Sequence, residues 1–411
     1  MTDPRALLSG RRLSAWRVLV GVLIVLTVVA GIIVVPWFLL RDDAAPGAAA
    51  GPRWFGGYDE VTAPQSSDGS LTGSGSDAVV LAFVTAGAGD ACSPTWGGVY
   101  SLAEASRTLD LDRRVAQTRG VGAPVTVSFG GARGAELAGA CSTVGDLMNA
   151  YAAVLERYTV STIDFDLEHA ALGDVVAGDR RAAAVARLQT RQHAKGSDLS
   201  VWLTLPAGQE GLGADGLRSI RQLLQAGVQL SGVNAMTKSD DTPLAGRSMA
   251  AAAITTLTAV HDQLGRLYDD LHLALPVSGA WGIMGVTPMI GQNDAHDEVF
   301  ALDDAAALNA FAQKQRLARV SMWSLNRDRA CPADRPDPRT VSDSCSGVAQ
   351  SEAAFAEVLG RGFALEPTLA GSAAPAAPVA QSARATGVAA ARRTGSPAPP
   401  PASTPTPTRD P

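Results

Sequence analysis

Short apolar runs rich in β-branched residues recur along the middle of this chain of 411 residues. Most of them are separated by segments with helical periodicity and helix start signals, such as the capping box that begins at Ser101 and ends at Glu104. Strands that alternate with helices pair in parallel through right-handed crossovers. The pattern predicts eight strands, at Trp54–Val61, Ala78–Ala86, Pro124–Gly131, Val160–Glu168, Leu199–Ala207, Ser231–Lys238, Leu271–Ala280 and Arg319–Asn326.

This alternation predicts an α/β fold, specifically a (β/α)8 TIM barrel. Eight strand–helix units in roughly 310 residues fit such a barrel better than an open doubly wound sheet. No GxGxxG motif begins a helix after the first strand, which argues against a dinucleotide-binding fold.

The fourth predicted strand carries three carboxylates at alternate positions. Side chains alternate between the two faces of a strand, so Asp164, Asp166 and Glu168 share one face and the apolar residues between them share the other. Like charges on one face raise the proton affinity of at least one acid, which keeps a proton donor available near neutral pH. The alternatives are a solvated strand face and a cation site. Glu168 ends the strand, where the catalytic groups of a barrel lie, and this favours a catalytic role.

The amino-terminal part of the chain contains an uninterrupted apolar segment without charges, Val18–Leu40. As a helix it is long enough to span a bilayer core of about 30 Å. Arginines precede it and Arg41 follows, so the positive-inside rule predicts a cytoplasmic amino terminus and an exported remainder. The alternative is a signal peptide that is cut within the small-residue stretch Ala44–Gly51, which would release the protein.

These patterns divide the chain into five parts. Residues 1–17 form a basic cytoplasmic segment, 18–40 a transmembrane signal anchor and 41–53 a linker. Residues 54–363 form the barrel domain. Residues 364–411, rich in Pro, Ala, Ser and Thr, contain too few bulky apolar side chains to offset the entropy cost of ordering, so we expect them to be disordered.

Charge and cysteine content limit the possible partners. The net charge of −6 and the lack of a basic cluster in the central region argue against a nucleic-acid surface. The four cysteines are even in number and lack CxxC spacing, so we expect two disulfides, Cys331–Cys345 and Cys92–Cys141. The five histidines are scattered and form no HExxH motif, so no metal site or cofactor is predicted. We also expect the protein to be a monomer.

Four separated motifs carry a resemblance to a known family. Ser128-Phe-Gly-Gly131 resembles an SxGG motif, and Asp164-Phe-Asp-Leu-Glu168 resembles a DxDxE signature. Gly285–Asp294 and Ser321–Asp328 are similar to the seventh and eighth strand regions of secreted bacterial chitinases. The chain therefore resembles a family-18 glycoside hydrolase of the short bacterial chitinase type, over about residues 54–362.

The resemblance implies a substrate and a role for each acid. The substrate would be chitin or another glycan containing N-acetylglucosamine. Glu168 would protonate the glycosidic oxygen while the 2-acetamido group of the substrate attacks the anomeric carbon. Asp166 would orient this acetamide, with Asp164 behind it. The residues expected to bind substrate are Trp323, as an apolar floor, and Met236, Ser128, Gln292 and Asn293.

One segment departs from the family pattern. Related chitinases carry an Asp–Tyr or Tyr–Asp pair after the sixth strand, where this chain has Thr237-Lys-Ser-Asp-Asp241. The tyrosine that would donate to the acetamide carbonyl is absent, and loss of such a donor costs a factor of about 100 or more in rate. The alternative function is therefore a glycan-binding cell-envelope protein with little or no hydrolytic activity. Lys238 could lower the pKa of a nearby acid, or contact an anionic glycan such as peptidoglycan.

Overall fold

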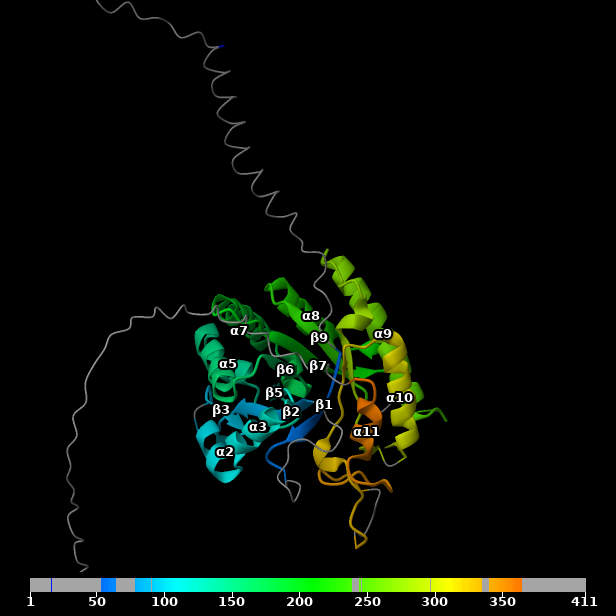
Figure 1. Cartoon of the computed structure of the whole chain (residues 1–411). Helices are drawn as coiled ribbons and strands as arrows, with labels where there is room; N and C mark the ends of the chain where they lie inside the picture. The colour runs from blue at the N-terminus through cyan, green and yellow to red at the C-terminus, as the bar shows by residue number, and fades with distance from the viewer. Residues whose placement is uncertain are drawn as a thin grey trace, which may run out of the picture. The chain divides into compact units, whose positions relative to one another are not determined.

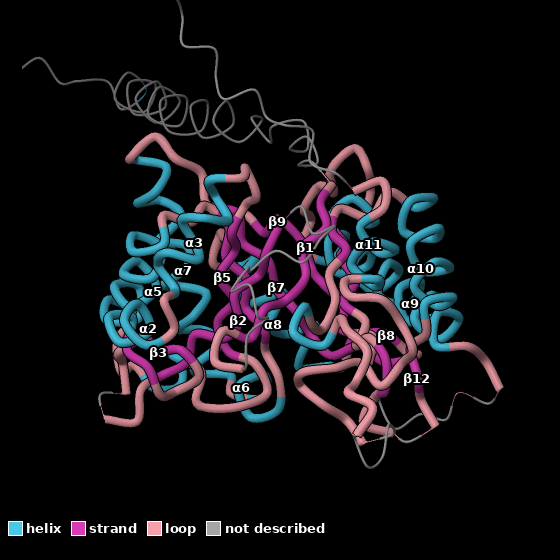
Figure 2. The backbone as a smooth tube through the Cα atoms, turned by 60° about the horizontal axis from the view of Figure 1, so that its bottom comes forward, coloured by secondary structure: helices cyan, strands magenta, loops and turns pink. Residues whose placement is uncertain are grey.

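A closed barrel of parallel strands forms the centre of the domain (Figures 1 and 2). The computed structural model describes Trp16 and residues 53–63, 78–89, 91–238, 244, 246–295, 297–334 and 340–363. Within these residues, eight parallel strands follow one another around the barrel in chain order, and the last pairs with the first to close it. They are β1 (Trp54–Glu60), β2 (Ala78–Ala86), β5 (Val125–Gly130), β6 (Thr162–Asp166), β7 (Ser200–Gly208), β9 (Leu230–Met236), β10 (Met284–Thr287) and β13 (Arg319–Val320). The predicted (β/α)8 barrel is confirmed.

Helices surround the strands on the outside, as Figure 2 shows. The capping box of Ser101 and Glu104 is present at the start of the first of them. The helices are α2 (Leu102–Thr108), α3 (Leu111–Gly120), α4 (Leu137–Ala140), α5 (Val144–Tyr158), α6 (His169–Gly173), α7 (Val175–Ala194), α8 (Ala214–Gln225), α9 (Met249–Asp270), α10 (Leu302–Gln315) and α11 (Ala354–Gly360). Two 3-10 turns, η1 (Ala280–Ile283) and η2 (Leu325–Arg327), flank β10 and β13.

Short strands complete the sheet at its margins. The pair β3 (Pro94–Trp96) and β4 (Tyr100–Ser101) extends β2 in antiparallel fashion, and β8 (Gly211–Leu212) pairs with β7. A separate two-stranded sheet joins β11 (Gly291–Gln292) to β12 (Val299–Phe300).

The alternation of β6 separates two kinds of packing. Phe165 points to the helices, where its ring stacks on Phe129 at 5.5 Å and meets the edge of Tyr151 at 5.2 Å. Asp164 and Asp166 lie on the opposite face, inside the barrel, and both are buried. The hydrophobic core between barrel and helices therefore holds the strand in place while its other face carries charge.

The predicted seventh strand at Leu271–Ala280 is wrong. That segment follows α9 as an irregular loop with Leu273 and Val277 exposed, and Pro276 cannot donate to a strand ladder. The strand lies later in the chain, at Met284–Thr287, where all four residues are buried. Hydropathy identified the apolar stretch Leu271–Ala280, but the buried strand is formed by the next apolar stretch, Met284–Thr287.

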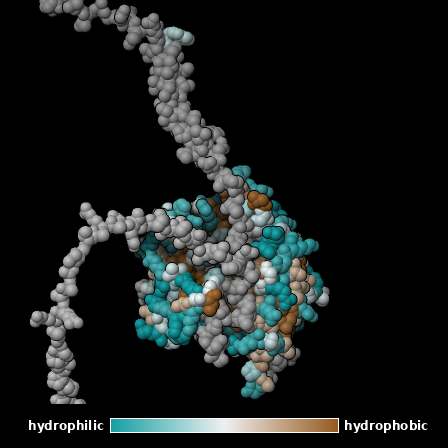
Figure 3. All heavy atoms as spheres, viewed as in Figure 1, coloured by the Kyte–Doolittle hydropathy of each residue, from teal (hydrophilic) through white to brown (hydrophobic). Residues whose placement is uncertain are grey.

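The terminal predictions cannot be compared with the structure. Val18–Leu40, the linker up to residue 52 and the tail 364–411 lie outside the described residues. Within the part that is described, no helix has both the length and the apolar character needed to cross a membrane. On the face of the domain in Figure 3, hydrophilic residues predominate and hydrophobic ones form separate spots.

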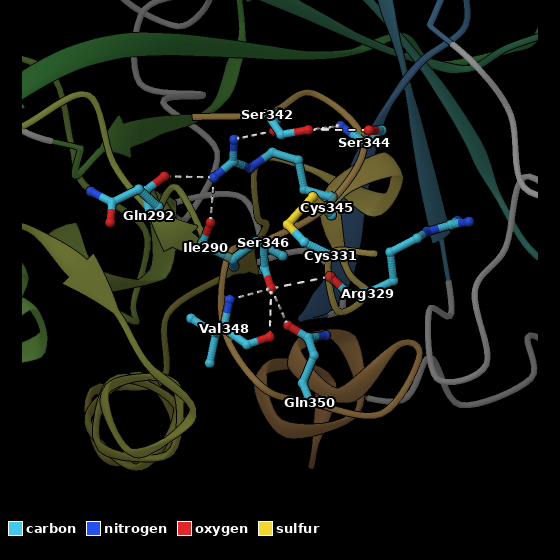
Figure 4. The surroundings of a disulfide bond; sticks show 11 residues. Ile290, Gln292, Arg329, Cys331, Ser342, Ser344, Cys345, Ser346, Val348 and Gln350 are labelled. Atoms are coloured by element: carbon cyan, nitrogen blue, oxygen red, sulfur yellow. Dashed lines mark hydrogen bonds between the residues drawn. A yellow bond between two sulfur atoms is a disulfide. The ribbon is translucent and has the colours of Figure 1, made fainter. Parts of the chain in front are cut away.

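Both predicted disulfides are present. Cys92–Cys141 joins the segment before β3 to the end of α4, and Cys331–Cys345 closes a loop after β13. Figure 4 shows the second bridge beside Ser346, whose hydroxyl contacts Arg329, Val348 and Gln350. The backbone N–H of Gln292 donates to the carbonyl of Ser346 at 2.7 Å, so this loop is attached to β11.

We predict that the two disulfides differ in their contribution to stability. Cys92–Cys141 spans 49 residues and Cys331–Cys345 spans 14. In the chain-entropy model the longer loop stabilises by about 4 kcal/mol and the shorter by about 3 kcal/mol. Paired Cys→Ser substitutions, compared by urea denaturation, should therefore lower the free energy of unfolding more for Cys92 and Cys141. An equal loss, or a larger one for the short loop, would contradict the entropic account.

Candidate active site

A cleft of about 360 Å³ lies at the carboxyl ends of the barrel strands. Its floor contains Asp166 and Glu168 from β6 and the residues that follow it. Aromatic and apolar side chains, acids and two cations line the rest. The remaining lining residues are Tyr58, Glu60, Thr62, Phe83, Thr85, Gly97, Ala132, Arg133, Met236, Lys238, Thr287, Met289, Asp294, Trp323, Val341 and Asp343.

Asp164 lies deepest of the three acids and is completely buried. Four side chains donate to its two oxygens. On Oδ2 the donors are the hydroxyls of Tyr58 at 2.9 Å and Ser128 at 2.7 Å. On Oδ1 they are the hydroxyl of Thr204 at 2.6 Å and Nη1 of Arg319 at 2.8 Å. With every lone-pair direction used, Asp164 serves as a fixed negative charge beneath the cleft.

Arg319 balances that charge. Its guanidinium is fully buried and also donates to the hydroxyl of Tyr58 at 3.0 Å. It lies over the rings of Trp54 at 4.7 Å and Trp202 at 5.4 Å, a favourable cation–π arrangement. Burial acts to lower the pKa of Arg319, but Tyr58 and Asp164 raise it, so the residue stays charged. Sequence analysis missed this role, although a charged residue at the start of an apolar strand was a visible signal.

Asp166 is buried but has no such support. Its Oδ1 atom lacks a hydrogen-bond partner among the described residues. Burial, followed by the charges of Glu168 and Asp164, raises the pKa of Asp166 well above its ordinary value. The charges of Lys238 and Arg319 act in the opposite direction without cancelling the effect. The surroundings of Asp166 therefore favour its protonated form more than those of an ordinary aspartate do.

Glu168 forms an ion pair with Lys238. Its Oε2 atom accepts from the ammonium group at 2.9 Å, and Nε2 of His169 lies 4.0 Å away. Burial acts to lower the pKa of Lys238, but the charge and hydrogen bond of Glu168 raise it, and the charges of Asp166 and Asp294 add to this. Lys238 is consequently an ammonium ion beside the predicted proton donor.

Two glycines allow β5 to approach β6 closely. A Cβ atom on Gly130 would lie 2.1 Å from the backbone oxygen of Asp166, and both Gly130 and Gly131 have positive φ angles. The N–H of Gly131 donates to this oxygen at 2.9 Å. The glycines of the SxGG motif thus position the backbone of Asp166.

An aromatic wall borders the acids. Trp323 stacks on Phe83 with the ring centroids 5.4 Å apart, and Tyr58 lies 6.0 Å from Trp323. Trp323 and Phe83 remain partly exposed in the cleft. Phe83 had no place in the sequence prediction, because an isolated phenylalanine in an apolar strand gives no signal of exposure.

The predicted substrate-binding residues fall into two groups. Met236 and Trp323 line the cleft. Ser128 lies beneath it and donates to Asp164, while Gln292 and Asn293 are buried and donate to backbone carbonyls of their own loop. These three residues are therefore placed to support the site from behind. Ser239 and Asp240, at the position of the missing tyrosine, lie outside the described residues.

The part of the chain that the structure describes contains no candidate metal site. No three His, Cys, Asp or Glu residues there are grouped so that they could hold an ion.

Comparison with known proteins identifies relatives of similar sequence. The chain is 32% identical over 288 residues to "Probable bifunctional chitinase/lysozyme" of Escherichia coli, covering 68% of this chain and 30% of the relative. It is 32% identical over 255 residues to "Endochitinase 11" of Metarhizium anisopliae, covering 60% of this chain and 47% of the relative. The chain thus spans less than half the length of either curated relative. No family model matches it.

Solved structures agree with this result. The catalytic domain of a hyperthermophilic chitinase from Pyrococcus furiosus superimposes with a TM-score of 0.64 and 26% identity, covering 76% of this chain and 96% of that domain. Catalytic-site mutants of that enzyme in complex with chito-oligosaccharides give a TM-score of 0.64 at 25% identity, with 77% and 96% covered.

We predict that Asp166→Asn stabilises the domain at neutral pH. The raised pKa of Asp166 means that the folded state binds its proton more tightly than the unfolded chain does. Stability is therefore lost as the pH rises from the ordinary value of 3.8 through the raised folded value. The uncharged amide avoids this loss, so the thermal midpoint should rise by roughly 2 °C or more at pH 7, and less near pH 4.

Asp164→Asn is the matched control. This change leaves the buried guanidinium of Arg319 without its counter-charge, so it should lower the midpoint at both pH values. Stabilisation by both substitutions, or by neither, would show that the two acids do not differ as described.

Proposed function

Because the chain belongs to family 18 of the glycoside hydrolases, we propose that its barrel is a chitinase-like enzyme acting on β-1,4-linked N-acetylglucosamine polymers. The observation that carries the proposal is the arrangement of the three acids. Asp164 is a buried carboxylate paired with Arg319, the surroundings of Asp166 favour its protonated form, and Glu168 follows the end of the same strand and lines the cleft. The names of the relatives, which include two chitinases, support the choice of substrate.

Each acid has a role in a substrate-assisted, retaining mechanism. Glu168 takes the proton of Asp166 and donates it to the glycosidic oxygen, and the C1–O bond breaks with its electron pair going to that oxygen. The carbonyl oxygen of the 2-acetamido group forms a new bond to C1, which gives an oxazolinium ion. Asp166, which is a carboxylate once its proton has passed to Glu168, orients the acetamide and stabilises this cation. Water then forms a bond to C1 and the bond between C1 and the acetamide oxygen breaks, while Glu168 takes a proton from the water, which restores the acid.

The aromatic wall provides the surface on which the sugar rests. Trp323 and Phe83 offer apolar faces beside the acids, and sugar rings bury their C–H faces against such rings. Met236 contributes a further apolar contact from the end of β9. Excluding water here strengthens the electrostatic interactions of the acids with the developing charge.

A second function is favoured by the segment after β9. Just before the position where the resemblance leads us to expect a phenol donor, the chain has Lys238, whose ammonium is bound to Glu168. A cleft of this kind could bind N-acetylglucosamine oligomers and hydrolyse them slowly or not at all. It would then serve as a glycan-binding protein of the cell envelope.

We also propose that the domain lies outside the cytoplasm, held by Val18–Leu40 as a single-pass anchor. The arginine-rich flank and the two disulfides support this arrangement. In a bacterium that expresses the full chain, protease added to intact spheroplasts should release the barrel domain. Release of the domain into the medium without protease would instead indicate a cleaved signal peptide, and complete protection would exclude export.

The test of enzymatic function is Glu168→Gln. The amide keeps the shape of the side chain but has no proton to donate, so turnover of an aryl chito-oligosaccharide by the barrel should fall at least about 100-fold. Binding of the same oligosaccharide, measured by calorimetry, should change little. Glu156→Gln provides a matched control, because it makes the same change at an exposed glutamate that pairs with Arg191 and does not line the cleft.

The outcomes separate the two functions. Wild-type turnover that Glu168→Gln abolishes supports the hydrolase. Tight oligosaccharide binding without wild-type turnover supports the glycan-binding protein. Absence of both binding and turnover at millimolar oligosaccharide would remove both proposals.

A further inference from the structure

Lys238 reaches the proposed proton donor from across a neighbouring strand. Glu168 lies two residues beyond the end of β6, and Lys238 lies two residues beyond the end of β9. In the barrel, β7 stands between these strands and pairs with both. The 2.9 Å contact between Nζ of Lys238 and Oε2 of Glu168 therefore passes over the carboxyl end of β7. It ties together two loops that both belong to the cleft.

The cleft around this contact is rich in acids. Its described lining contains five carboxylates, Glu60, Asp166, Glu168, Asp294 and Asp343, and two cations, Lys238 and Arg133. Arg133 lies 3.5 Å from Asp343, which follows β13, so it balances a different acid. This excess of negative charge would repel an anionic glycan. The partners of Lys238 are therefore the carboxylates of the cleft and not a charged substrate.

Lys238 acts on both acids at once. It binds Glu168 directly, and its charge works against retention of the proton by Asp166. The groups that face the ammonium are Glu168 and Asp166 from β6 and its extension and Asp294 from the β10 side, with His169 beyond Glu168. The other cation that acts on Asp166, Arg319, is bound to Asp164 beneath the cleft. Of the two cations in the described lining of the cleft, Lys238 is thus the one whose charge acts on Glu168 and Asp166.

We propose that Lys238 is a positioning residue that holds Glu168 against the β9 side of the cleft and, through its charge, sets the upper pH limit of activity. This proposal rests on the proposed hydrolase function. After Glu168 gives its proton to the glycosidic oxygen, the ammonium stabilises the carboxylate that remains. Its charge also works against retention of the proton by Asp166, so its presence restricts activity to lower pH.

The sign of the effect follows from the charges. Because the charge of Lys238 lowers the pKa of Asp166, its removal raises that pKa further and keeps the proton on the acid pair to higher pH. In Lys238→Met the alkaline limb of the kcat/KM profile should therefore move up by about one pH unit. Lys238→Arg, which retains the charge, should keep the limb near its wild-type position. Binding of oligosaccharide should stay within about threefold in both variants.

Lys195→Met is the matched control. Lys195 also pairs with a glutamate, Glu156, at 3.2 Å, but on the outer surface of the barrel and not in the cleft. Its replacement removes the same charge and should leave the pH profile unchanged. Superimposable profiles for wild type and Lys238→Met, or an equal shift in Lys195→Met, would overturn the proposal while leaving the hydrolase function intact.

A second measurement does not depend on turnover. Carboxyl ¹³C NMR of protein labelled at aspartate, with Asp166→Asn used for assignment, follows the titration of Asp166 directly. Its midpoint should lie higher in Lys238→Met than in the wild type. If the wild type binds glycan without cleaving it, this measurement still decides the role of Lys238, and an unchanged midpoint would refute it.

Discussion

The buried ion pair between Arg319 and Asp164 is the interaction on which the rest of the site depends. Both side chains are completely excluded from solvent, and either one alone would be an uncompensated charge costing several kcal/mol. Hydrogen bonds from Tyr58, Ser128 and Thr204 satisfy the remaining directions of Asp164. These partners come from β1, β5, β7 and β13, while Asp164 itself lies on β6. Closing the barrel and neutralising its charge are therefore one event, because neither set of contacts exists until the strands meet.

The three acids differ in their hydrogen-bond and ion-pair partners from the inside of the barrel to the cleft. Asp164 is fully paired, Asp166 has an oxygen without a partner, and Glu168 is paired again, by Lys238. Burial and the charges of the two neighbouring acids therefore raise the pKa of Asp166, although the cations beside those acids act in the opposite direction. Buried acids of this kind destabilise the folded state relative to a well-packed apolar core. The same raised pKa makes proton transfer possible near neutral pH.

The surroundings hold the backbone of this site from several sides. Gly130 lets β5 come against the carbonyl of Asp166, where a Cβ atom would collide, and a Cβ atom on Gly131 would collide with the ring of Phe83. The loop closed by Cys331 and Cys345 is attached to β11 through Ser346. Arg327 adds to this attachment by donating to the carbonyls of Ile290 and Gln292. Residues that resemble family motifs without touching the cleft therefore serve as its rigid support.

Local patterns in the sequence determined the class of fold, the placement of most strands and the face that the three acids share, because a period of two residues is a local property of a strand. The same reasoning placed the seventh strand wrongly at Leu271–Ala280, since hydropathy cannot distinguish an exposed apolar loop from the buried stretch that follows it. Only the tertiary structure decided the partners of the acids. Arg319 lies 155 residues from Asp164 and Lys238 lies 70 residues from Glu168. Ion pairs over such separations are fixed by barrel closure, which brings side chains together at distances that no spacing in the sequence encodes.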